Sequence, residues 1–94
     1  MIQDLHHLDR ELQSALDFEF TLDDDEKFRE LLHASLDLIS LDPGTLACAM
    51  GVSLTTVLRW KNGNAIPYPV MRRPVYRFLR RKVSAKLTEL AAVV

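Results

Sequence analysis

The sequence predicts an all-α protein, a small bundle of about five helices with an extra helix at the N-terminus. Apolar residues recur at spacings of three and four along most of the 94-residue chain, as in helices that bury one face. Gly, Pro, Asp and Ser residues divide this pattern at positions typical of helix ends. No segment carries the sustained alternation of a half-buried strand. We therefore expect helices only.

The composition is that of an ordinary globular protein, with 48% hydrophobic and 27% charged residues. The apolar runs are far shorter than the roughly 20 residues that a membrane span needs. The N-terminus lacks the basic and apolar regions of a signal peptide. Cys48 is the single cysteine, which excludes an intrachain disulfide and suits a reducing compartment. These features predict a cytoplasmic protein without a membrane partner.

The net charge of −1 conceals a strong asymmetry along the chain. Residues 1–42 carry a net charge of −9, and residues 43–94 carry +8. A basic half can bind a polyanion even when the whole chain is nearly neutral. The alternative is that the two halves simply neutralise each other.

Residues 1–17 predict a helix of about four turns with one apolar stripe. We interpret residues 1–20 as an N-terminal extension for oligomer or partner contact, and residues 21–94 as a separate domain. The stripe could also fold back onto its own domain, and an acidic N-terminal region could bind another protein. The stripe consists of Ile2, Leu5, Leu8, Leu12 and Leu16.

The next helix is expected to begin after Thr21, which stands three residues before Asp24 as in a capping box. The acidic run that follows lies at the positive end of the helix dipole. The predicted inner face consists of Phe28, Leu31, Leu32, Ser35, Leu36 and Ile39.

Three further helices complete the bundle. Asp42 before a proline predicts the start of a short helix over 43–50. Ser53 predicts the start of another helix, which continues to about residue 61. After a loop with two prolines, the last helix is expected to begin near Pro74, because proline is unfavourable inside a helix. Residues 70–73 are then expected to form a turn.

The two short helices, joined at Gly51, predict a helix-turn-helix. Ala47 is small enough for the close approach of the helices, and glycine accepts the left-handed turn conformation. Five residues are expected to face inward: Leu46, Met50, Val52, Val57 and Trp60. Five are expected to face outward: Ser53, Leu54, Thr55, Thr56 and Arg59.

The stretch "LACAMGVSLTTVLRWKNG", residues 46–63, resembles the helix-turn-helix of the lambda repressor-like family, also called the Cro/C1 or XRE type. The resemblance covers roughly residues 24–83 and leaves out the N-terminal helix. Pro43 replaces the family's usual glutamine at the start of the first motif helix. Leu54 and Thr55 replace the glutamines at the start of the second. The resemblance implies binding to double-stranded DNA but not the sequence that is read.

The resemblance also implies which residues meet DNA, with helix 53–61 in the major groove. Arg59 is the candidate for a bidentate guanine contact, although it could contact phosphate only. Leu54 could instead belong to the core, as could Trp60. A basic cluster of Arg77, Arg80, Arg81 and Lys82 could contact the DNA backbone or be merely solvated. The candidate base contacts are Leu54, Thr55, Thr56 and Arg59. The candidate phosphate contacts are Thr45, Ser53, Lys61, Asn62, Arg72 and Arg73.

No catalytic or metal pattern accompanies this motif. His6, His7 and His33 lack ligand spacing, and Cys48 has no neighbouring histidine in the sequence to activate it. Three glycines do not form a phosphate-binding loop. We expect no enzyme, no cofactor and no metal.

These observations predict a small dimeric transcriptional regulator of a bacterium, phage or plasmid, most simply a repressor that occupies a palindromic operator. Dimerisation is expected because one short recognition helix discriminates poorly against competing genomic sites. One alternative is an antitoxin that binds a toxin protein and represses its own operon. Another is a protein adaptor that has kept the fold without binding DNA.

Overall fold

A computed structural model of the chain describes residues 2–18 and 23–93, and every element within them is a helix. The all-α prediction is confirmed. The five helices are α1 (Ile2–Asp17), α2 (Asp25–Leu38), α3 (Pro43–Met50), α4 (Leu54–Asn62) and α5 (Pro69–Val93).

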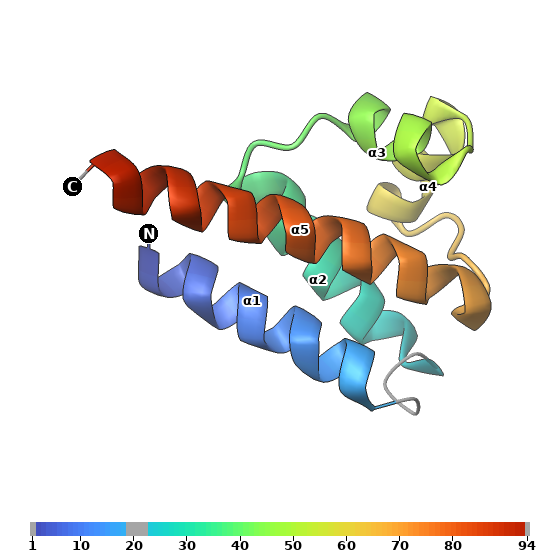
Figure 1. Cartoon of the computed structure of the whole chain (residues 1–94). Helices are drawn as coiled ribbons and strands as arrows, with labels where there is room; N and C mark the ends of the chain where they lie inside the picture. Colours follow the sequence, from blue (N-terminus) through green and yellow to red (C-terminus); the bar gives the residue numbers. More distant parts are fainter. Residues whose placement is uncertain (1, 19–22, 94) are drawn as a thin grey trace.

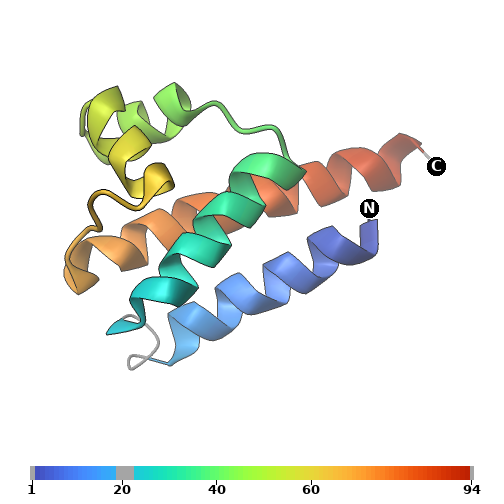
Figure 2. The same ribbon diagram turned by 180° about the vertical axis from the view of Figure 1, so that it is seen from behind.

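The long helix α5 forms the centre of the arrangement. Helix α1 lies beside it in the opposite direction, so that both chain ends lie at the same end of the molecule (Figures 1 and 2). Helix α2 crosses α5, and α3 and α4 lie on the other side of α5 from α1. No helix in the described ranges is long and apolar enough to cross a lipid bilayer.

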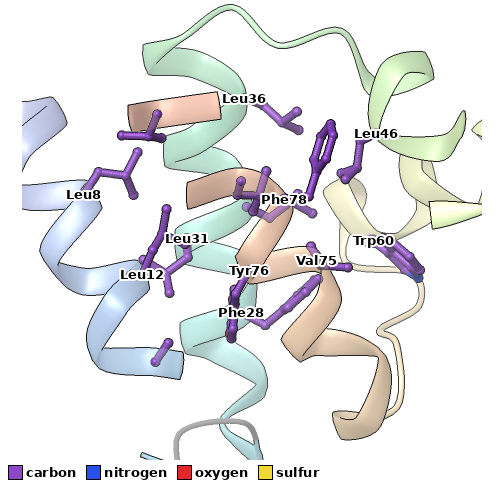
Figure 3. Close-up of a cluster of buried hydrophobic side chains, with 14 of the residues drawn as sticks. Leu8, Leu12, Phe28, Leu31, Leu36, Leu46, Trp60, Val75, Tyr76 and Phe78 are labelled. Carbon is purple, nitrogen blue, oxygen red and sulfur yellow. The ribbon is translucent and has the colours of Figure 1, made fainter. Parts of the chain in front are cut away.

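One hydrophobic core joins all five helices. Phe28 of α2 lies near its centre, with its ring centroid 6.1 Å from that of Trp60 and 5.7 Å from that of Tyr76. Figure 3 shows Phe28 and Tyr76 between Leu8 and Leu12 of α1 on one side and Trp60 of α4 on the other. The predicted inner face of α2 is confirmed, with Ile39 packed at its edge.

Helix α1 is a full part of this core, so the division of the chain at residue 20 does not match the packing. Leu5, Leu8, Leu12 and Ala15 are buried against the rest of the chain. Leu16 is partly buried, and the side chain of Ile2 lies outside the described part. The apolar stripe is therefore not free for an oligomer or partner contact. Of the three alternatives, folding back onto its own domain is the one observed.

Ion pairs fasten α1 to its neighbours. Glu11 lies 2.7 Å from Lys27 Nζ of α2, and Asp9 lies 3.3 Å from Arg80 Nε of α5. The hydrogen bond from Lys27 lowers the pKa of Glu11, and the same bond raises the pKa of Lys27. Part of the charge asymmetry is thus neutralised within the chain.

The helix starts agree with the sequence at α3 and α4 and differ at α2 and α5. Asp24 is the N-cap of α2 and accepts a hydrogen bond from the Lys27 amide at 3.0 Å, whereas Thr21 lies outside the described residues. Helix α5 begins at Pro69, so residues 70–73 are helical and the predicted start near Pro74 is wrong. Val70 is 80% exposed, and water can reach the carbonyl group that Pro74 leaves without a donor.

Candidate nucleic-acid interface

Helices α3 and α4 form the predicted helix-turn-helix, and each is capped at both ends. Asp42 accepts a hydrogen bond from the Gly44 amide at 3.2 Å, and Ser53 accepts one from the Thr56 amide at 3.1 Å. Gly51 and Gly63 end the two helices in the left-handed conformation, with φ of 70° and 79°. Such caps satisfy amide and carbonyl groups that short helices otherwise leave unpaired. The pair is therefore a well-defined structural unit.

The inner side of this unit is held by buried side chains. Leu46, Val57 and Trp60 are buried, and Ala47 is buried where the two helices approach each other. Met50 and Val52 are partly buried against the same core. Figure 3 shows Leu46 beside Phe78 of α5, and Trp60 reaching toward Val75. Trp60 is thus a core residue, and the orientation of α4 depends on this packing.

The outer side of α4 carries the candidate base-contacting residues. Leu54 is 49% exposed, and Thr55 and Arg59 are exposed beside it. Leu54 is therefore not part of the core. Thr56 is half-buried, and its hydroxyl group lies 2.9 Å from that of Ser53. The two hydroxyl groups therefore form a hydrogen bond with each other at the N-terminal cap of α4.

Leu58 is a surface residue that the sequence analysis missed. It is 38% exposed and lies one helical turn after Leu54. The spacing of four from Leu54 was the signal that could have identified it. We call Leu54, Thr55, Leu58 and Arg59 the α4 outer face.

The candidate phosphate contacts fall into two groups. Thr45 and Asn62 are exposed and Lys61 is half-buried, all on α3 or α4, and Ser53 is exposed at the N-cap of α4. Arg72 and Arg73 lie on α5 and have other partners.

Arg72 is buried, and its predicted phosphate contact is wrong. The residue is 3% exposed. Its Nη2 lies 2.7 Å from Asp25 Oδ1, and its Nε donates to the carbonyl oxygen of Pro67 at 2.9 Å. The guanidinium also lies 5.8 Å from the centroid of the Phe28 ring. Arg72 therefore ties the loop before α5 to α2.

Arg73 is partly buried and faces α1. Its Nη1 donates to the carbonyl oxygen of Leu16 at 3.3 Å, on the far side of α5 from α3 and α4. It does not belong with the candidate contacts on the helix-turn-helix.

The electrostatic setting of this unit is one-sided. From residue 43 to residue 88 the sequence holds nine Lys and Arg residues and neither Asp nor Glu. Within the described ranges, Arg59, Arg77 and Arg81 form no ion pair. Cations without a carboxylate partner favour the approach of an anion.

The part of the chain that the structure describes holds no group of three or more His, Cys, Asp or Glu side chains placed to bind a metal ion. Cys48 is exposed on α3.

Comparison with known proteins returned no match, neither to a family model nor to a curated protein nor to a solved structure.

Proposed function

We propose that this protein binds double-stranded DNA in a sequence-dependent manner and acts as a small cytoplasmic transcriptional regulator, most simply a repressor that occupies its operator. The observation that carries the proposal is the α4 outer face. It is exposed on a helix capped at both ends and anchored in the core by Val57 and Trp60. No catalytic chemistry is part of the proposal.

The size and side chains of α4 suit the major groove. Nine residues make a helix about 14 Å long, and the groove, about 12 Å wide, admits one helix. Arg59 can donate two hydrogen bonds to guanine, and the methyl groups of Leu54, Leu58 and Thr55 can contact thymine methyl groups. The α4 outer face would then supply the base contacts.

Phosphate contacts would come from the ends of the two short helices. Thr45 lies in the first turn of α3, and Lys61 and Asn62 lie in the last turn of α4. The Ser53 hydroxyl can accept its cap bond and still donate to a phosphate oxygen. These contacts would give affinity and salt dependence but no sequence preference.

We further propose that the protein binds as a homodimer to a palindromic operator, with two α4 helices one DNA turn apart, about 34 Å or a multiple of it. The buried stripe of α1 does not provide the dimer interface. Light scattering of the protein with and without its selected duplex measures the stoichiometry.

The alternative, an antitoxin that holds a basic toxin against the acidic N-terminal region, has less support. Asp9 and Glu11 are paired with Arg80 and Lys27, and the leucines of α1 are buried. Less of that region is therefore available to a toxin than its composition suggests.

The test is selection of bound duplexes from a random pool, followed by anisotropy titrations with the selected and with bulk DNA. We expect Arg59→Ala to reduce the preference for the selected duplex by about 1–3 kcal/mol, the usual discrimination of a bidentate contact. Lys61→Gln is the control, because loss of a phosphate contact weakens all duplexes alike. Absence of binding to any duplex at low salt would contradict the proposal, since charge attraction is then strongest.

A further inference from the structure

The outer side of α5 carries a basic surface that the helix-turn-helix does not account for. Arg77 and Arg81 are exposed one helical turn apart, and Lys82 is exposed next to them. We call these three residues the α5 ridge. Two grooves border it. One, of about 540 Å³, is lined by Leu16, Arg77, Arg80, Arg81 and Ser84. The other, of about 210 Å³, is lined by Phe78, Arg81, Lys82 and Ala85.

The charges of the ridge are available to a ligand. In the described ranges neither arginine of the ridge has a carboxylate partner, and Lys82 has none either. Arg80 differs, because it lies 3.3 Å from Asp9 and is neutralised within the chain. The acidic half of the protein therefore reaches the edge of this surface but leaves the ridge uncompensated.

Arg81 and Lys82 of the ridge adjoin the helix-turn-helix through Phe78, whereas Arg77 borders the groove that Leu16 of α1 lines. The Arg81 guanidinium lies 6.0 Å from the centroid of the Phe78 ring, and Lys82 Nζ lies 5.5 Å from it. Phe78 in turn lies beside Leu46 of α3 (Figure 3). Cation–π contacts of this kind favour particular side-chain positions. Two of the three charges are thus held near the side of α5 that faces α3.

We propose that the α5 ridge binds phosphate groups of a nucleic-acid backbone, next to the groove that α4 enters on the same duplex. This inference rests on the proposed function and adds a second contact surface to it. Guanidinium groups match phosphate geometry in bidentate fashion. Arg77 and Arg81 lie about 6 Å apart along α5, so their two guanidinium groups can contact different phosphate groups. The Ser84 hydroxyl, also exposed, can donate to a phosphate oxygen within the larger groove.

The experiment compares three proteins on the selected duplex across a salt series. They are the unmodified chain, the double variant Arg77→Gln with Arg81→Gln, and a control variant Arg10→Gln with Lys86→Gln. Both variants lose two positive charges. Arg10 lies on α1, and Lys86 lies 3.9 Å from Glu89, so the control leaves the ridge intact. All four residues are at least partly exposed, and circular dichroism checks that each variant folds.

We expect the ridge variant to lower the slope of log K against log salt by about 1.8, since each phosphate contact contributes about 0.9. Its preference for the selected duplex over bulk DNA should stay unchanged. The unmodified protein should also gain affinity when the duplex is lengthened by half a turn at each end, and the ridge variant should not. The control variant should match the unmodified protein in both respects.

Two results overturn the inference. One is a slope and a length dependence of the ridge variant equal to those of the control. The other is unchanged DNA binding together with lost binding of a fluorescent poly-glutamate probe, which would assign the ridge to an acidic protein. Failure of the proposed function gives a different result from both. The unmodified protein would then show no preference for a selected duplex over bulk DNA, and Arg59→Ala would have no such preference to remove.

Discussion

At the scale of single residues, Tyr76 shows the cost of burying a polar atom. The residue is fully buried in the core, and its hydroxyl group has no hydrogen-bond partner among the described residues. Burial raises the pKa of Tyr76 to about 12, because the phenolate would lose its hydration. The ring contributes to the aromatic contacts around Phe28, whereas the hydroxyl group contributes no hydrogen bond.

We expect Tyr76→Phe to leave the free energy of unfolding at pH 7 unchanged or slightly higher, since an unpaired buried hydroxyl is removed. The variant should differ from the unmodified protein at high pH. The pKa of Tyr76 in the folded state is above the unfolded value near 10, so the folded state favours the neutral phenol. The contribution of this preference to stability is complete below pH 10 and is lost as pH rises toward 12. The loss is roughly 2–3 kcal/mol for a shift of about two units. Urea unfolding from pH 9 to pH 12 measures it.

Tyr68→Phe is the matched control, because Tyr68 is exposed in the loop before α5. It should retain the decline in stability that Tyr76→Phe lacks. Parallel pH profiles for the unmodified protein and Tyr76→Phe would contradict the assignment of the decline to this hydroxyl group.

At the scale of elements, the two short helices depend on glycines that end them. Gly51 has a φ of 70°, a conformation that costs an L-residue roughly 1–2 kcal/mol. A Cβ added at Gly51 would meet no atom within 4 Å. The cost of a substitution there is therefore a backbone cost and not a clash.

We expect Gly51→Ala to lower the free energy of unfolding by about 1 kcal/mol, with an unchanged denaturant slope. Gly44→Ala is the control. Gly44 lies in α3 without a positive φ, and its added Cβ would lie 3.3 Å from an oxygen of the flexible Asp42 side chain. It should cost less or even stabilise the helix. Equal losses for the two variants in urea titrations would refute the backbone explanation.

At the scale of the whole molecule, one core makes the folding of the helix-turn-helix depend on α1. Helix α1 covers α5 and part of α2, and α5 with α2 supports α3 and α4. The buried leucines of α1 would otherwise leave an apolar surface on α5 open to water. A chain of 94 residues has little stability to spare, so such a loss is serious.

We expect Leu12→Ala, at a fully buried position, to reduce the free energy of unfolding by about 2–5 kcal/mol. Unfolding should remain one transition, so that the fluorescence signal from Trp60 of α4 and the far-ultraviolet signal coincide. Ser14→Ala is a neighbouring control at an exposed position of α1 and should change the free energy of unfolding by no more than about 0.5 kcal/mol. Two separate transitions for Leu12→Ala would indicate that α1 is the detachable extension that the sequence suggests.

The extent to which this fold could be predicted differs between local and distant interactions. Asp42, Ser53 and Gly51 were each identified as helix ends, because a cap involves only groups two to five residues apart. The buried face of α2 followed from its spacing in the same way. The start of α5 was predicted wrongly near Pro74. A helix tolerates a proline where water reaches the carbonyl group that the proline leaves without a donor, and the sequence does not show whether it does.

The candidate site divides along the same line. Leu54, Thr55 and Arg59 were expected on the outer side of α4 and are exposed there, since helix periodicity determines which residues share a face. Leu58 was overlooked on that face although its spacing from Leu54 indicated it. Arg72 resembled a surface cation in the sequence, and its burial depends on Asp25, which is 47 residues away.

The sequence by itself thus determined the two short helices, their caps and most of the outward residues of α4, because those depend on contacts within about one helical turn. Only the tertiary structure decided that α1 belongs to the core, that Arg72 is buried, and that Arg80 is paired with Asp9 while the α5 ridge has no carboxylate partner among the described residues. Each of these depends on which helix surfaces meet. Residues far apart in the chain exclude water from one another only after the helices have packed, and no local spacing records that.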